Sequence, residues 1–323
     1  MIPLRSPEEA RRPTAIALGS FDGLHQGHQR VIAAVTQCRS PGADLIIPTV
    51  VSFWPHPREV LHGETRLRLD LPQEKLELLE PLGIQQLVLV PFTLELASLS
   101  PETFMEQVLI GQLQVREVAV GENFRFGRDR RGDVKTLCDL GARFGVKVSV
   151  LPMVWNGSER VSSSRIRRAL AAGDIREAGR LLERPYRFCG DVVRGRGLGR
   201  QLGWPTANLR VDGRKFLPLE GVYAARAWLN DTLSPERPLA AVMNLGPQPT
   251  VDPDAPSAVE VHLLDGEHEL VGQQMLVEPL ALLRRQKKFE SLDALKNQIR
   301  CDADEARRRC GDAGCLSSPD RHA

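Results

Sequence analysis

Two histidines lie three residues apart in the stretch Gly19-Ser20-Phe21-Asp22-Gly23-Leu24-His25-Gln26-Gly27-His28. Residues 14–18 before it predict a buried strand, and apolar residues recur at helical spacing between residues 31 and 35. We therefore expect His25 and His28 at a helix N-terminus, where free N–H groups and the helix dipole favour phosphate, as in a nucleotide triphosphate. A helix cap whose histidines face solvent is the alternative. The residues expected at the phosphates are Gly19, Phe21, Asp22, His25, Gly27 and His28.

Two more clusters in the first half carry groups that suit a nucleotide. Asn123 lies in the loop 121–127, directly after a strand-like run, where open α/β sheets bind ligands. Residues 161–168 place serines at a predicted helix start, and Arg165 and Arg168 lie three apart on one helix face. The hydroxyl groups and guanidinium groups of Ser163, Ser164, Arg165 and Arg168 would clamp a polyphosphate. A structural loop and a capped helix with a solvated basic face are the alternatives.

The second half contains a glycine-rich stretch, residues 190–208, that ends in Pro-Thr-Ala-Asn. Closely spaced glycines expose N–H groups that form an anion nest, although a flexible β-hairpin has the same composition. No Gly-Lys-Ser/Thr follows, and β-like runs rather than a helix surround the glycines, so neither a P-loop nor a Rossmann fingerprint is present.

Glu260 lies in a short strand-like run. Val259, Val261 and Leu263 alternate with it and share the opposite strand face. If the apolar face packs into the core, Glu260 faces an open site or solvent. A general base and a solvated carboxylate are both compatible with this pattern.

Composition limits the class of protein. The 323 residues predict two domains, and a net charge of +2 implies no general attraction to nucleic acid or to a membrane. Six cysteines are scattered without a C-x-x-C pair, which argues against a zinc knuckle or a redox dithiol. The N-terminus lacks the apolar core of a signal peptide, and no run of about 18 apolar residues occurs. We expect a reduced, cytoplasmic protein.

The order of predicted elements divides the chain near residue 184. Before it, strand-like and helical patterns alternate, which predicts a doubly wound parallel sheet in residues 1–184. After it, short β-like runs separated by Gly and Pro predict a small β-barrel in residues 185–310. A helix over 291–309 is expected to pack Leu292, Leu295 and Ile299 against this barrel. We expect residues 311–323 to be a disordered tail.

The first-half motifs, taken in order, resemble the adenylyltransferase half of the bacterial bifunctional riboflavin kinase/FAD synthetase family. The resemblance covers most of residues 14–182 and includes the HxGH turn, Phe53-Trp54-Pro55-His56-Pro57, the G-x-N-F-x-F-G loop and S-S-x-R-I-R. Ser164 stands where the family usually has threonine, and Thr93 stands where aspartate is common.

The second half resembles the flavokinase signature G-x-V-x-x-G-x-x-x-G-R-x-L-G-x-P-T-A-N over about residues 186–309. Further matches follow in order at 221–224, 244–246 with Pro249-Thr250, 260–265, 283–284 and 288–289. The resemblance implies a six-stranded barrel. Departures from the family occur at Gln248, Gly266 and Val271.

The resemblance implies that ATP phosphorylates riboflavin to FMN and then adenylates FMN to FAD, with Mg²⁺ in both steps. FMN and FAD are then products rather than tightly bound cofactors. By resemblance, Thr206 and Asn208 hold Mg²⁺ and the ATP phosphates, and Glu260 accepts the ribityl hydroxyl proton. The further kinase-side ATP contacts are Gly195, Gly197, Gly199, Arg200, Gly203 and Pro205, and the flavin contacts are Asn244, Glu260, Arg284 and Phe289. A flavokinase with an inert first domain and a flavin-binding regulator without turnover are the alternatives.

Overall fold

A computed structural model describes residues 1–37, 46–195, 199, 203–229, 238–246, 259–266 and 268–312. The chain forms two compact units, Met1–Ser163 and a second that begins at Ser164. Gly197, Arg200, Gln248 and Pro249-Thr250 lie outside the described residues.

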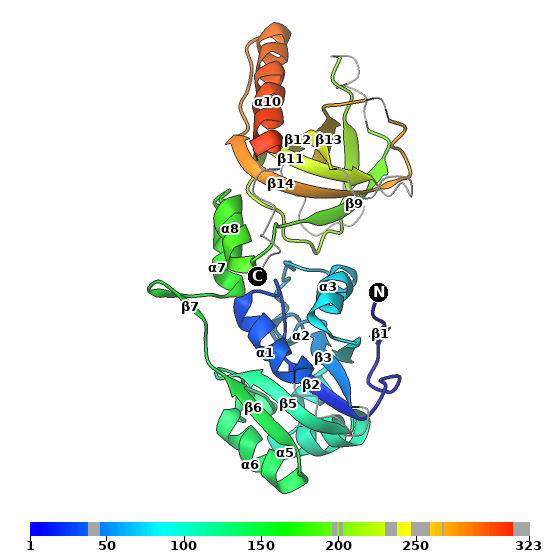
Figure 1. The fold of residues 1–323 in the computed structure, drawn as a ribbon, viewed down its shortest axis with the longest axis vertical. Coiled ribbons are helices and arrows are strands. Elements are labelled where there is room, and N and C mark those ends of the chain that lie inside the picture. The colour runs from blue at the N-terminus through cyan, green and yellow to red at the C-terminus, as the bar shows by residue number, and fades with distance from the viewer. Residues whose placement is uncertain are drawn as a thin grey trace, which may run out of the picture. The chain divides into compact units, whose positions relative to one another are not determined.

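The first unit is built on a six-stranded parallel sheet with the order β1-β4-β3-β2-β5-β6. The strands are β1 (Leu4–Arg5), β2 (Thr14–Leu18), β3 (Ile47–Trp54), β4 (Gln86–Pro91), β5 (Val115–Gly121) and β6 (Lys147–Leu151). The chain runs outward from β2 through β3 to β4 and then returns to the other side of β2 with β5 (Figure 1). The strand order therefore reverses between β2 and β5, and open α/β sheets bind ligands in this crevice at the carboxyl ends of the strands.

Helices cover both faces of this sheet, which confirms the predicted doubly wound architecture. Side chains alternate along β2: Ile16 packs into one hydrophobic core and Ala17 into the other. Helices α1 and α3 cover the Ala17 face, and α5, its π-helical continuation η2, and α6 cover the other. The bounds are α1 (Gln26–Thr36), α2 (Pro57–His62), α3 (Pro72–Leu79), η1 (Glu80–Leu82), α4 (Leu94–Ser98), α5 (Pro101–Phe104), η2 (Met105–Gln112), η3 (Arg128–Arg130) and α6 (Val134–Phe144).

The second unit contains a closed antiparallel barrel of six strands with the order β10-β13-β12-β11-β14-β9. Its strands are β9 (Phe188–Val193), β10 (Ala207–Arg210), β11 (Gly221–Leu229), β12 (Leu239–Leu245), β13 (Val259–Leu263) and β14 (Gln274–Arg284). Its helices are α7 (Ser163–Ala171), α8 (Ile175–Leu182) and α10 (Leu292–Asp312). Helix α8 contacts β14, and the second unit, which begins at Ser164, includes α7 and α8 together with the barrel. Both helices precede residue 184, near which the sequence predicted the domain boundary.

Helix α10 packs on the barrel through the predicted face at Leu295 and Ile299, which line the barrel cavity, but not at Leu292. The face continues at Ala303 and Ala306. Leu292 is 65% exposed, whereas Ala303 and Ala306 are fully buried against β-strand residues such as Ala224. Alanine allows the helix backbone to approach the barrel closely, which larger side chains would prevent. The helix also continues to Asp312, beyond its predicted end and into the stretch expected to be disordered.

Short elements were not predicted, because two to six residues carry little periodicity. They include β1, the helices α2 and α4, and the hairpin β7 (Trp155–Asn156) with β8 (Glu159–Arg160). None of the helices in the described ranges combines the length and the apolar composition that a membrane crossing requires.

Candidate functional site

The HxGH turn connects the carboxyl end of β2 to α1. His25 is the residue before the first turn of α1, and its side chain accepts no hydrogen bond from the first N–H groups of the helix. Phe21 (φ 45°) and Leu24 (φ 42°) adopt left-handed backbone conformations, yet both side chains are buried. Such conformations cost about 1–3 kcal/mol each and occur at functional sites, where the surrounding structure holds them.

The two imidazole rings stack on each other. Their centroids lie 3.8 Å apart at an interplanar angle of 17°, and the Phe21 ring contacts His28 edge-on. Within the described part of the chain, the buried Nδ1 atoms of His25 and His28 have no hydrogen-bond partner. Burial and, secondly, the charge of Arg160 lower the pKa of His25 to about 4, and burial followed by His25 lowers the pKa of His28 well below its usual range. Both rings are therefore neutral at neutral pH and present unpaired polar atoms.

This burial predicts a pH dependence of stability. The unfolded chain protonates His25 below about pH 6.5, whereas the folded unit does so only near pH 4. The unfolded state therefore binds more protons between these values, and the free energy of unfolding should fall as pH decreases from 6.5 to 4, by up to about 3 kcal/mol. Urea titrations followed by hydrogen exchange of the α1 amides measure this. His25→Asn should show a weaker decline, and an equal decline in variant and parent would contradict the assignment.

Asp22 connects the turn to the segment before α3. Its buried Oδ1 accepts the backbone N–H groups of Leu69 at 2.9 Å and Asp70 at 3.3 Å. Ser163, the last residue of the first unit, donates its hydroxyl to the Asp22 carbonyl at 2.7 Å. The Asp22 side chain and the Ser163 hydroxyl are therefore engaged in hydrogen bonds that hold the turn in place. These atoms contribute to the structure of the turn, although the sequence had predicted both residues as phosphate contacts.

Asn123 is exposed in the turn after β5, beside β2 in the sheet. Its neighbour Phe124 stacks on the buried Phe126 with ring centroids 5.6 Å apart. The aromatic pair anchors this loop, which follows the carboxyl end of β5, the strand beside β2.

Ser164, Arg165 and Arg168 belong to the second unit, on α7. Arg165 forms an ion pair with Glu177 of α8 at 2.7 Å, and Glu177 also accepts two hydrogen bonds from Arg180. Arg168 is exposed. The two arginines therefore differ in exposure: Arg165 is partly buried in its ion pair with Glu177, and Arg168 is exposed.

His56 of the Phe-x-Pro-His-Pro segment caps α2. Its Nδ1 accepts the N–H of Arg58 at 3.1 Å, and the Glu59 carboxylate accepts the backbone N–H of His56 at 2.7 Å. Arg68 forms an ion pair with Glu59 and lies over the Trp54 ring, 5.0 Å from its centroid. These contacts give the segment a structural role next to the carboxyl end of β3.

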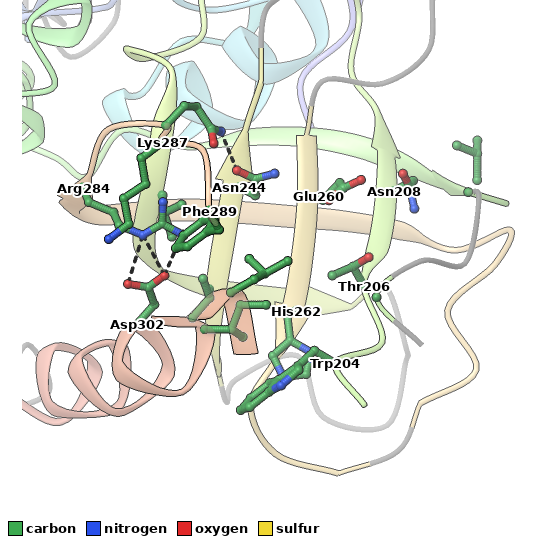
Figure 2. A pocket seen from close by; sticks show the side chains of 18 of the residues that line it. Trp204, Thr206, Asn208, Asn244, Glu260, His262, Arg284, Lys287, Phe289 and Asp302 are labelled. Atoms are coloured by element: carbon green, nitrogen blue, oxygen red, sulfur yellow. Dashed lines mark hydrogen bonds and ion pairs between the residues drawn. The ribbon is translucent and has the colours of Figure 1, made fainter. Parts of the chain in front are cut away.

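In the barrel, the strand register places Asn208, Glu260, Asn244, Val222 and Arg284 in one row across neighbouring strands. Asn208 pairs with Glu260, Glu260 with Asn244, and the row continues through Val222 to Arg284. The alternating residues of β13 are buried, which confirms the expected apolar face opposite Glu260. Figure 2 shows the carboxylate of Glu260 between the two asparagine side chains.

The glycine-rich stretch packs closely against this row. A Cβ at Gly195 would lie 2.0 Å from the Asn208 amide, and one at Gly199 would lie 2.3 Å from the Trp204 carbonyl and 3.1 Å from the Thr206 hydroxyl. Only glycine allows this approach. Gly195, Gly199, Thr206, Asn208 and Glu260 all line a cavity of about 900 Å³.

The opposite side of the same cavity contains Arg284 and Phe289. Asp302 of α10, which is 5% exposed, holds the Arg284 guanidinium at 2.9 and 3.0 Å, and Arg284 lies over the Phe289 ring (Figure 2). Asn244 accepts a hydrogen bond from Gln286 at 2.6 Å. A cavity of this size with a few convergent polar groups is typical of a small-molecule site.

Comparison with known proteins gives two matches to family models. A FAD synthetase model matches residues 7–165, and a riboflavin kinase model matches residues 182–310. A bifunctional riboflavin kinase/FMN adenylyltransferase of Pseudomonas fluorescens is 37% identical over 96% of this chain and 95% of its own length. The chain belongs to the bifunctional riboflavin kinase/FMN adenylyltransferase family.

A second curated relative and a solved structure are similar to this chain along nearly its whole length. The bifunctional riboflavin kinase/FMN adenylyltransferase of Haemophilus influenzae is 35% identical over 91% of the chain and 93% of its own. A crystal structure of a macrolide-efflux protein from Streptococcus pneumoniae has a TM-score of 0.81 and 28% identity, and covers 95% of this chain and 98% of that one.

Three buried or cavity-lining side chains of this flavokinase/adenylyltransferase chain were missed by the sequence interpretation. Lys75 lies beside Leu76 on the apolar face of α3, and Asp302 lies near Ile299 on the apolar face of α10. A charged residue on an apolar helix face was the signal by which the sequence could have revealed both. His262 lines the barrel cavity; its Nδ1 lies 2.6 Å from the Pro205 carbonyl and its ring contacts Trp204 edge-on. His262 lies two residues after Glu260, on the same strand face.

Proposed function

We propose that the barrel unit transfers the γ-phosphoryl group of ATP to riboflavin, and that the parallel-sheet unit adenylates the resulting FMN to FAD with release of pyrophosphate. The row that brings Glu260 between Asn208 and Asn244 carries the first assignment. The two family matches and the bifunctional relatives support the pairing of the two reactions in one chain.

In the kinase reaction, the Glu260 carboxylate accepts the proton of the ribityl hydroxyl group as that oxygen attacks the γ-phosphorus. Asn208 and Thr206 lie beside it and contact the ATP phosphates, with the backbone N–H groups around Gly195 and Gly199. The loop contacts Gly203 and Pro205 complete this side. Riboflavin occupies the side with Asn244, Arg284 and Phe289, where the Phe289 ring offers a flat apolar surface to a flavin. Phosphoryl transfer depends mainly on positioning and charge neutralisation, so few acid/base groups are needed.

The residues next to Glu260 fit a magnesium ion. Mg²⁺ prefers oxygen ligands, and Thr206 and Asn208, which offer a hydroxyl and an amide oxygen at the start of β10, line the same cavity. When bound with ATP, Mg²⁺ neutralises phosphate charge. Thr206 and Asn208 would hold it, and Glu260 remains available for the proton.

In the adenylylation reaction, neutral His25 and His28 donate hydrogen bonds to the α-phosphate as negative charge increases on it. The N-terminus of α1 adds the positive end of the helix dipole. Asn123, at the neighbouring strand end, contacts the nucleotide. The remaining phosphate contacts, by resemblance to the family, are Gly19, Gly27, Ser163, Ser164, Arg165 and Arg168. No covalent intermediate is formed.

Incubation of the chain with riboflavin, ATP and Mg²⁺, followed by chromatography, tests the proposal. FMN should appear first and FAD should follow. FMN alone would indicate a flavokinase with an inert first unit, and unchanged riboflavin with retained flavin binding would indicate a regulator. Either outcome would contradict the proposal.

Removal of the Asp302 charge is expected to weaken riboflavin binding. Asp302→Asn leaves the Arg284 guanidinium without its carboxylate partner, so Arg284 and Phe289 lose their fixed position at the cavity. A hydrogen bond to a charged group contributes about 1.5–3 kcal/mol, and we expect the KM for riboflavin to rise about tenfold or more. FAD synthesis from supplied FMN should not change.

Asp304→Asn is the matched control, because Asp304 lies on the same helix but is 64% exposed, and its ion pair with Arg307 is at the surface. Steady-state kinetics of both variants with riboflavin and with FMN separate the outcomes. An unchanged KM for riboflavin in folded Asp302→Asn would reject the positioning of Arg284 at the flavin.

A further inference from the structure

One buried lysine lies beside the HxGH turn and has no part in the chemistry proposed above. Lys75 of α3 is only 6% exposed, although lysine is almost never fully buried without a partner. Its Nζ donates to the Ser20 carbonyl at 3.3 Å, and this carbonyl also accepts the Ser52 hydroxyl at 3.2 Å. The cavity that these residues line measures about 10 Å³, so its volume is too small for a substrate. The side chain therefore acts on the turn itself.

Two buried carboxylates face the same region. Asp22 is 6% exposed and Asp70 is 2% exposed. Burial lowers the pKa of Lys75, whereas the charges of Asp22 and Asp70 raise it and so favour the ammonium form. Loss of that ammonium group would remove a positive charge from beside two carboxylates, behind a turn that has to bind negatively charged phosphates. Repulsion between like charges is strong in a buried, low-dielectric site.

We propose that Lys75 is a positioning residue for adenylyl transfer, whose buried ammonium group holds the Ser20 carbonyl and offsets the charges of Asp22 and Asp70 behind the HxGH turn. Phe21, directly after Ser20, has a φ of 45°, a strained conformation that requires support from neighbouring groups. The charge of Lys75 also reaches the catalytic turn, because it contributes to the low pKa of His28. The inference rests on the proposed adenylylation of FMN at this turn.

Lys75→Met removes the ammonium group and keeps most of the side-chain length. FAD synthesis from FMN and ATP should fall about 10- to 100-fold, the factor that corresponds to one charged hydrogen bond. Riboflavin phosphorylation by the same chain should stay at the parent rate and serves as an internal control, since the barrel lies in the other unit. Lys135→Met is the matched control, because Lys135 is exposed on α6. Parent-like FAD synthesis in Lys75→Met would overturn the proposal.

A second variant separates charge compensation from a merely structural role. Asp70→Asn, added to Lys75→Met, restores the charge balance. The double variant should make FAD at least about tenfold faster than Lys75→Met and should be more resistant to urea than Lys75→Met. Independent, multiplicative losses of the two substitutions would overturn the proposal, as would a folded but inactive double variant. If Lys75→Met does not fold, recovery of folding and activity in the double variant supports the proposal.

The parent chain is assayed first, so that the two hypotheses are distinguished. A parent that makes no FAD from FMN would contradict the proposed function. The unfolding measurements on the four chains of the double-mutant cycle would then still decide whether Lys75 and Asp70 compensate each other, and the absence of coupling would overturn the inference.

Discussion

Glu260→Gln is expected to slow riboflavin phosphorylation by about 10²- to 10⁴-fold, because a positioned general base contributes a factor of this size. The substitution keeps the shape of the side chain and its place between Asn208 and Asn244, but it removes the group that accepts the proton. Initial rates of FMN formation from riboflavin, ATP and Mg²⁺ measure the effect. FAD synthesis from supplied FMN should persist, since the HxGH turn lies in the other unit.

Glu269→Gln is the matched control, since Glu269 is an exposed glutamate of the same unit. Circular dichroism checks folding, and ATP binding checks that the segment with Thr206 and Asn208 is intact. Riboflavin phosphorylation within about threefold of the parent would reject Glu260 as the base. Simultaneous loss of FMN and FAD synthesis would indicate a structural role for this carboxylate instead.

The site at the HxGH turn could be predicted from the sequence because the residues that form it are close together in the chain. A buried strand, a turn with two glycines between the histidines and their strand, and an amphipathic helix follow one another within residues 14–36, and the structure contains them as β2, the turn and α1. The alternation of strand-like and helical patterns was also sufficient to predict the parallel sheet. The left-handed conformations of Phe21 and Leu24 could not be predicted, because non-glycine residues rarely adopt them and tertiary packing enforces them here.

The site in the barrel cavity depends on contacts between residues that are far apart in the sequence. Asn208, Glu260 and Asn244 come together only through the register of three strands, and a register shift of one residue would move each side chain to the other face. Asp302 meets Arg284 because α10 packs on the barrel through Ala303, which lies one turn after Ile299 on the same helix face. A charged residue on an apolar helix face was the remaining signal, and its partner cannot be identified from the helix alone.

His28→Ala should abolish FAD formation while FMN continues to accumulate. The His28 ring is buried, stacked on His25 and neutral, so it can donate a hydrogen bond where negative charge develops on the α-phosphate. Loss of one such donor typically costs about 10²- to 10³-fold in rate. The kinase residues around Glu260 lie in the second unit, so riboflavin should still be converted to FMN. Chromatography of a reaction with riboflavin, ATP and Mg²⁺ measures both products.

Because His28 is buried, alanine leaves a void that could also unfold the turn, and two further variants address this. His28→Asn fills more of the space and retains an N–H donor, so it should recover part of the FAD synthesis if hydrogen bonding to phosphate is the function of this residue. His62→Ala removes an exposed histidine from α2 of the same unit and should have no effect. FAD formation at the parent rate in folded His28→Ala would reject the phosphate-binding role of the turn. A loss shared equally by the Ala and Asn variants, with the fold intact, would show that the reaction requires the imidazole ring itself, because an amide that donates a hydrogen bond does not replace it.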